Sequence, residues 1–378
     1  MHFQKRLASG LTVVGERMPH LRSVSVGLWV NAGSLHERPE ENGISHFIEH
    51  MVFKGTARRS ARDIADEMDG VGGNLNAFTA KDCTCFYATV VDEHLPLALD
   101  ILFDMVFHPS LPEDEMEKEK MVVGEEIAMV EDTPEELSGD LLAEAYFGSH
   151  PLGQPILGPE ENVAAFTRAQ VLDYMNRFYQ PGNMVFFVQG QYDFKKIIRL
   201  AEKYMSDIPA VEIENRRTPP PLYIPEHLTV TKDTHQAHVM IGSRGYNAYD
   251  DKRTALYLLN NILGGPGMNS KLNVSLRERR GLVYNVESNL TSYTDTGAFC
   301  IYFGTDIEDM DTCLKLTYKE LKRMRDVKMT SSQLAAAKKQ LIGQIGVASD
   351  NFENNALGMA KTFLHYHKYE SSELVFKR

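Results

Sequence analysis

Three side chains suited to metal chemistry lie within one short segment, HFIEH: His46, Glu49 and His50. Residues four apart on an α-helix lie one above the other, so the imidazoles of His46 and His50 can converge on a single ion. Glu49, three residues after His46, would face the same ion as a general base instead of binding it. This HxxEH order is a zinc-hydrolase signature. The spacing therefore predicts a zinc-binding helix within Gly43–Phe53.

A catalytic zinc site also needs a third protein ligand and an open position for water. The segment from Glu113 to Glu126 reads as part of a long helix with a proline at its start, and Glu119 and Glu126 lie two turns apart on one face of it. Either glutamate could reach inward. The 3.6-residue period predicts an apolar flank that partly buries this face, formed by Met121, Val122, Ile127 and Met129.

Four blocks of the sequence resemble one family, the pitrilysin/insulinase zinc metallopeptidases, whose motif order is called inverzincin. They are GISHFIEHMVFKGT from Gly43, NAFT from Asn76, GEEIAMVEDTP, in which Glu126 follows His50 by 76 residues, and NNILGGPGMNSKLNVSLRERRGLVYNV from Asn260. Within that family the chain is similar to the β-subunit of mitochondrial processing peptidase and its bacterial homologues. The resemblance spans nearly the whole chain.

The resemblance implies a role for each residue of the metal site. His46, His50 and Glu126 would bind one Zn²⁺ per chain, and Glu49 would activate the water in the fourth position. Glu119 would stand behind the ligands without touching the ion.

The resemblance also implies a substrate site. Arg277 and Tyr284, seven residues apart in the fourth block, would steady the substrate carbonyl and its oxyanion. We expect the peptide to lie extended along an edge strand at Asn76, Ala77 and Phe78, because an added strand satisfies its backbone groups without reading its sequence.

Several of these assignments have a structural alternative. Glu125 is adjacent to Glu126, so the choice between them rests on the family's register. Arg277 could be a surface arginine and Tyr284 a half-buried strand tyrosine. Glu119 could be a solvated glutamate on a charge-rich helix. A lone HxxEH can also arise by chance in an amphipathic helix.

The composition is that of an ordinary globular protein. The chain has 378 residues, 43% hydrophobic and 24% charged, which favours two domains. A net charge of −12 argues against nucleic-acid binding. No long apolar run predicts a membrane span, and MHFQKRLASGLTVV reads as two strands around a turn at Ser9-Gly10. We therefore expect a cytoplasmic protein without membrane attachment.

The pattern of elements predicts an α+β fold of two homologous domains, each a mostly antiparallel sheet packed with helices. A proline-rich linker at 215–225 would separate a zinc-binding catalytic domain, 1–214, from a metal-free copy, 226–378. The helix predicted at Ala255–Leu263 stands where the metal helix stands in the first half, but it has no histidine or glutamate. The second copy is expected to be truncated at its end, by about 30–50 residues.

These expectations combine into a zinc endopeptidase acting on peptides or unfolded, presequence-like segments in an enclosed chamber. Relatives of this length imply a homodimer, or a heterodimer with a homologous subunit, in which the arginine and tyrosine of one subunit serve the zinc of the other. Two other readings are a non-catalytic structural or partner subunit of the same fold and a zinc-dependent binding module.

Overall fold

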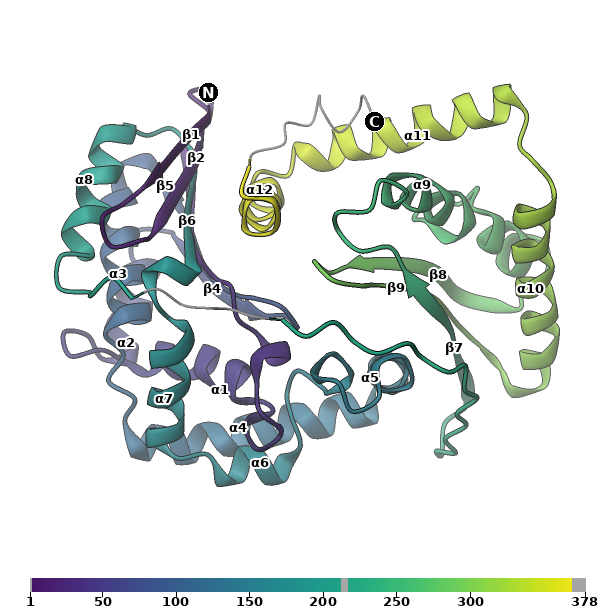
Figure 1. Cartoon of the computed structure of the whole chain (residues 1–378), viewed down its shortest axis with the longest axis horizontal. Coiled ribbons are helices and arrows are strands. Elements are labelled where there is room, and N and C mark those ends of the chain that lie inside the picture. Colours follow the sequence, from purple (N-terminus) through teal and green to yellow (C-terminus); the bar gives the residue numbers. More distant parts are fainter. Residues whose placement is uncertain (1, 212–216, 369–378) are drawn as a thin grey trace. The chain divides into compact units, whose positions relative to one another are not determined.

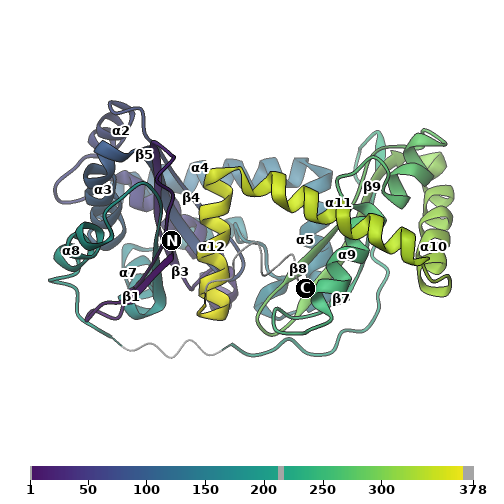
Figure 2. The ribbon, with the colours of Figure 1, turned by 90° about the horizontal axis from the view of Figure 1, so that it is seen from above.

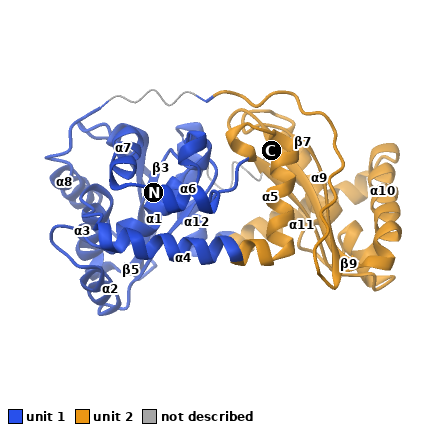
Figure 3. Cartoon of the chain, turned by 90° about the horizontal axis from the view of Figure 1, so that it is seen from below, with its two compact units in different colours: residues 1–128, 154–217, 349–372 blue, residues 129–153, 218–348, 373–378 orange. Residues whose placement is uncertain are grey.

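The computed structural model describes residues 2–211 and 217–368. They divide into two compact units, coloured separately in Figure 3. Unit 1 takes in the described parts of 1–128, 154–217 and 349–372, and unit 2 those of 129–153 and 218–348. The elements of unit 1 are β1 (His2–Arg6), β2 (Thr12–Arg17), β3 (Ser23–Val30), α1 (Ile44–Met51), α2 (Ala61–Asp69), β4 (Asn74–Thr79), β5 (Thr84–Val91), α3 (Leu95–Phe107), most of α4 (Glu113–Asp132), α6 (Glu160–Ala165), α7 (Arg168–Phe178), β6 (Met184–Gly190), α8 (Phe194–Tyr204) and α12 (Phe352–Tyr366).

The strands of unit 1 form a six-stranded sheet in the order β1-β2-β6-β3-β5-β4. Every neighbouring pair is antiparallel except β2 with β6. Successive strand residues point to opposite faces: Leu28 joins the larger core under α1, α3 and α7, whereas its neighbour Trp29 joins the core on the other face. Strand β4 ends the sheet at one side. The sheet therefore has two apolar faces and needs cover on both.

Helix α12 covers the second face, opposite α3 and α8 (Figures 1 and 2). Its Phe363 is buried there, and its His365 pairs with Asp82 at 3.1 Å. Burial opposes ionisation of Asp82, but the bond with His365 and the charge of Lys361 outweigh it and hold the pKa of Asp82 well below its ordinary value. This contact between His365 and Asp82 thus fixes the end of α12 on the sheet.

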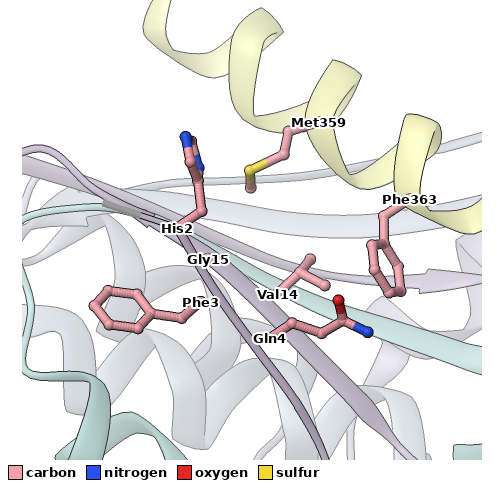
Figure 4. A pocket seen from close by; sticks show the side chains of 7 residues that line it. All are labelled: His2, Phe3, Gln4, Val14, Gly15, Met359 and Phe363. Carbon is pink, nitrogen blue, oxygen red and sulfur yellow. The ribbon is translucent and has the colours of Figure 1, made fainter. Parts of the chain in front are cut away.

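A small cavity remains between α12 and the hairpin β1–β2 (Figure 4). Its volume is about 20 Å³, which is room for a single water molecule. It is lined by His2, Phe3, Gln4, Val14, Gly15, Met359 and Phe363. Such a space is too small for a peptide, so it is a packing gap in the core between α12 and the sheet.

Unit 2 contains a three-stranded antiparallel sheet in the order β7-β9-β8. Helix α5 packs on β7, where Gly242 admits the tyrosine ring of Tyr146; a Cβ at that glycine would lie 1.9 Å from the hydroxyl. The elements are the end of α4, α5 (Pro134–Phe147), β7 (Gln236–Gly245), α9 (Arg253–Gly264), a π-helical turn (Asn273–Glu278), β8 (Val283–Ser292), β9 (Gly297–Asp306), α10 (Met310–Asp326) and α11 (Ser331–Ser349).

The predicted fold class and internal repeat are confirmed. In chain order β3-α1-β4-β5-α3 matches β7-α9-β8-β9-α10, and the strand order β3-β5-β4 recurs as β7-β9-β8. The compact units do not follow the expected division at 214 and 226, because α5 packs on the sheet of the second half and α12 on that of the first. Residues 215–216 of the expected linker lie outside the described residues. The expected second domain also includes residues after 368, which lie outside them too. Residues 217–225 form no helix or strand.

Across 2–211 and 217–368, each helix is too short or too polar to span a bilayer.

Candidate metal and active site

Helix α1 presents the HxxEH residues because its other face is buried. Ile44, Phe47, Ile48 and Met51 are fully enclosed in the larger core of unit 1, leaving the face with His46, Glu49 and His50 half-buried. The two imidazole rings lie 4.6 Å apart between centroids, and their Nε2 atoms are 3.3 Å apart. The predicted helix and its convergent histidines are therefore present.

The start of α1 depends on a buried carboxylate that sequence reasoning missed. Glu37 accepts hydrogen bonds from the backbone N–H groups of Gly43, at 2.9 Å, and Ser45, at 2.8 Å, and from the amide of Asn42. Burial raises the pKa of Glu37, against the effect of these bonds. The carboxylate satisfies N–H groups that a helix end leaves free. Gly43 has φ +101°, and a Cβ there would lie 2.4 Å from the Leu157 carbonyl oxygen, so the entry to α1 requires glycine.

Helix α4 contributes the third donor. Oε2 of Glu126 lies 3.6 Å from Nε2 of His46 and 3.6 Å from Nε2 of His50. Ligand atoms around a tetrahedral zinc ion, each at about 2.0–2.1 Å, are about 3.3–3.4 Å from one another. The observed triangle has nearly these edges, and these three residues are the group within 2–211 and 217–368 that could hold a metal ion. Glu125 is exposed instead.

The donor set is that of a catalytic zinc site, with two imidazoles and one carboxylate. Burial, aided by neighbouring His50, lowers the pKa of His46 to about 4, so its imidazole is neutral and able to bind a metal at neutral pH. Burial acts the same way on His50, but its bond with Glu119 and the nearby carboxylates outweigh it and raise its pKa. A metal bound here would displace a proton. The residues fit the ion that the sequence implied.

Glu49 stays outside this triangle. Its Oε2 accepts a hydrogen bond from the Thr79 hydroxyl at 2.6 Å. Burial raises the pKa of Glu49 against the effects of Thr79 and His50. A carboxylate beside a metal site but not part of it is placed to accept and return a proton, and a raised pKa makes it the stronger base.

Glu119 lies behind the donor triangle of His46, His50 and Glu126. Its Oε1 is 2.7 Å from Nδ1 of His50 and its Oε2 is 2.5 Å from Nζ of Lys54. It is 4% exposed, so it is not a solvated glutamate. The bond to Nδ1 leaves Nε2 of His50 directed at the other donors, and Lys54 fixes the carboxylate that makes this bond.

We expect Glu119→Gln to weaken zinc binding about 10- to 100-fold, because the amide loses the charge that orients and strengthens His50. Competition with a chelator measures the dissociation constant. Glu117→Gln is the matched control, since Glu117 is exposed on the same helix and pairs with Lys120. Equal zinc affinity in the Glu119 variant and the wild type would contradict this role.

The predicted apolar flank of α4 is wrong for three of its four residues. Met121 is 68% exposed, and Val122 and Met129 are exposed too, whereas Ile127 packs against the larger core as predicted. The buried side chains of α4 are instead Met116, Glu119 and Val123, which follow one another at the three- and four-residue spacing of a single helix face. The methionines that suggested burial lie on the other faces.

The predicted substrate strand is the edge strand β4. Asn76, Ala77 and Phe78 lie in its middle, and the sheet continues on only one side of it, through β5. Edge strands carry backbone groups that can pair with an added strand. Thr79, which the sequence analysis did not single out, is the next residue of β4.

Arg277 and Tyr284 belong to unit 2. Arg277 lies in the π-helical turn and its guanidinium stands 5.8 Å from the centre of the Tyr284 ring. Tyr284 is 85% exposed, so it is not the half-buried strand tyrosine of the alternative reading. The structure brings these two residues together with the side chains facing solvent, and π-helical turns are frequent at functional sites.

Comparison with known proteins gives the family. The model of the insulinase family, peptidase family M16, matches residues 12–160, and that of the peptidase M16 inactive domain matches residues 165–341. An uncharacterized zinc protease of Bacillus subtilis, YmxG, is 41% identical over 364 residues, which are 95% of this chain and 88% of that protein. One from Streptomyces coelicolor is 36% identical over 366 residues, 94% of this chain and 79% of that protein.

Solved structures show the same fold. The crystal structure titled a peptidase M16 inactive domain from Pseudomonas fluorescens has a TM-score of 0.90 at 21% identity, covering 100% of this chain and 94% of that one. A protease from Helicobacter pylori has a TM-score of 0.84 at 20% identity, covering 100% and 95%. With both M16 domain models matched along the chain and relatives named zinc proteases, this protein belongs to peptidase family M16, the insulinase family.

Proposed function

We propose that this chain is a zinc-dependent endopeptidase that hydrolyses peptides, or unfolded and presequence-like segments, inside an enclosed chamber. The observation that carries the proposal is the triangle of donor atoms from His46, His50 and Glu126, 3.3 to 3.6 Å on each side, with Glu49 beside it. Membership of a peptidase family whose named relatives are zinc proteases supports the same reaction class.

In this mechanism His46, His50 and Glu126 would hold the ion. Bound zinc supplies Lewis acidity, which makes water acidic enough to ionise near pH 7 and polarises a carbonyl. Glu49 takes a proton from the attacking water and returns it to the amine that leaves. Glu119 holds the ring of His50 in place throughout, and burial raises the pKa of Glu49.

The substrate would pair with the edge of β4 along Asn76, Ala77 and Phe78. Backbone pairing binds an extended peptide whatever its sequence, so it favours unfolded segments over folded proteins. Arg277 and Tyr284 would stabilise the negative charge that develops on the carbonyl oxygen. Both have exposed side chains, as groups that meet a substrate must.

We propose that the working enzyme is a dimer in which Arg277 and Tyr284 act on the zinc site of the partner subunit. Mixing a Glu49→Gln chain with a Tyr284→Phe chain is then expected to restore hydrolysis, because one active site of the mixed dimer has neither defect. The measurement is peptide cleavage by a purified mixed dimer carrying two different affinity tags. A mixed dimer no more active than either parent would reject the arrangement, whereas each variant alone gives the baseline.

A second candidate is a structural or partner subunit of the same fold that does not cleave peptides. It is favoured by the family model that matches residues 165–341, because that model is described as an inactive domain. The full HxxEH set argues against it for the first half. A zinc-binding module without turnover is disfavoured by Glu49, since a purely structural zinc site fills its fourth position with protein. The cytoplasmic location expected from the sequence stays a prediction.

One experiment separates these candidates. Zinc per chain is measured by elemental analysis, and hydrolysis of a quenched peptide library is followed before chelation, after chelation and after zinc is returned. An endopeptidase binds one zinc per chain and loses and regains cleavage with it. A chain that binds zinc but cleaves nothing in the library is a binding or structural subunit.

A further inference from the structure

The general base is held by a hydroxyl from another element. Oγ1 of Thr79 lies 2.6 Å from Oε2 of Glu49, although the two residues are 30 apart in the sequence. A carboxylate can only accept a hydrogen bond, so the threonine hydroxyl donates. Bonds of this length to an ionised oxygen are among the stronger ones in proteins. They also fix a group whose last torsion angle is otherwise broad.

Thr79 also lies on the strand that is expected to bind the substrate. Thr79 is the last residue of β4, opposite Thr84 of β5, and directly follows Asn76–Phe78 along the edge of the sheet. Helix α1, which presents Glu49, packs on the same strand. The strand expected to receive the peptide backbone therefore also carries the group that sets the rotation of the base.

We propose that Thr79 is the positioning residue of the general base: its hydroxyl holds one oxygen of Glu49, so that the other is presented to the attacking water in register with a peptide on β4. The inference rests on the proposed peptidase function. Asn76 to Phe78 would position the substrate, and Thr79 would fix the Glu49 carboxylate relative to that substrate. The Thr79 hydroxyl acts through Glu49, to which it is bonded, and not on the reacting atoms.

The test uses two substitutions that differ by one hydroxyl. Thr79→Val keeps the shape and the branched side chain but cannot donate, whereas Thr79→Ser keeps the hydroxyl. We expect Thr79→Val to lower kcat about 10- to 100-fold, the loss typical of a residue that orients a metal-site group. KM, zinc per chain and the melting temperature should stay close to those of the wild type, and Thr79→Ser should restore most of kcat.

Thr89→Val is the matched control. Thr89 is another strand threonine of the same sheet, and its hydroxyl bonds to Ser25 and Glu353 instead of a site residue. Wild-type kcat is expected for it. A wild-type kcat in Thr79→Val, or a loss in Thr79→Ser as large as in Thr79→Val, would overturn the inference.

A structural readout separates this inference from the proposed function. Crystal structures of the zinc-loaded wild type and Thr79→Val are expected to show the Glu49 carboxylate in one position in the first and rotated or split between positions in the second. An unmoved carboxylate rejects the role of Thr79 whether or not the chain cleaves peptides. A wild type that cleaves nothing, with the carboxylate displaced in Thr79→Val, rejects the peptidase and leaves the positioning intact.

Discussion

Replacing Glu49 by glutamine is expected to lower kcat about 10²- to 10⁴-fold, the range that general acid–base catalysis contributes, with zinc still bound. Glutamine has nearly the same shape and its carbonyl oxygen can still accept the bond from Thr79. It cannot take a proton from water at neutral pH. Because Glu49 lies outside the donor triangle, the affinity for zinc should change little.

The measurements are zinc per chain and steady-state hydrolysis of a quenched peptide. Glu40→Gln makes the same chemical change at an exposed residue ahead of α1 and should behave as the wild type. Glu49→Gln with unchanged kcat would show that another group carries the proton. A variant that loses zinc along with activity would show that Glu49 helps to bind the ion, which the geometry of the site does not support.

The parts of this site that the sequence predicted are the local ones. His46, Glu49 and His50 lie within two turns of one helix, so the period of the helix alone places them on one face. Glu119 and Glu126 are likewise two turns apart on α4. The choice of Glu126 over Glu125 came from the family's register, because the helical period of α4 does not say which of its faces meets α1.

The parts that were missed depend on contacts between distant segments. Glu37 satisfies the start of α1 from six residues before Gly43, beyond the adjacent positions at which helix caps are usually sought. Thr79 and Lys54 lie inside the blocks NAFT and GISHFIEHMVFKGT, but the blocks do not show that these side chains reach Glu49 and Glu119. Their roles follow from tertiary packing, for which one sequence carries no direct signal.

Which segments make up each of the two units also depends on contacts between distant segments. The sequence analysis assigned residues 226–378 to the second domain, so it did not anticipate that α12 packs on the first sheet. Only the alternation along β3, with Leu28 on one face and Trp29 on the other, shows that the first sheet needs cover on both sides. The helix that covers its second face comes from the end of the described chain, which breaks the simple division into two halves.

The turn after α1 rests on one buried carboxylate, and its removal should have the largest effect on stability. Asp104 of α3 is 2% exposed. It accepts bonds from the hydroxyl of Thr56 at 2.7 Å, from Nε of Arg58 at 3.0 Å and from Nη1 of Arg59 at 3.0 Å. All three donors belong to the turn that follows Lys54. Asp104 therefore joins that turn to the core of unit 1.

Asp104→Asn is expected to lower the free energy of unfolding by about 3 kcal/mol, near the lower end of the cost of breaking a buried ion pair. The amide keeps the shape of the carboxylate but turns an N–H group toward donors that need an acceptor. The loss stays at the lower end because Arg59 retains bonds to Glu67 and Asp100. Urea denaturation followed by circular dichroism measures the change.

Asp66→Asn provides the comparison, because Asp66 is exposed and its pair with Arg62 lies on the surface of α2; such pairs contribute about 0–1 kcal/mol. The effect of Asp104→Asn should also reach the metal site. The turn that Asp104 anchors directly follows Lys54, which holds the Glu119 carboxylate that orients His50, so zinc affinity should fall together with stability. A variant as stable as the wild type would mean that Thr56, Arg58 and Arg59 find other acceptors, and it would contradict this role of Asp104.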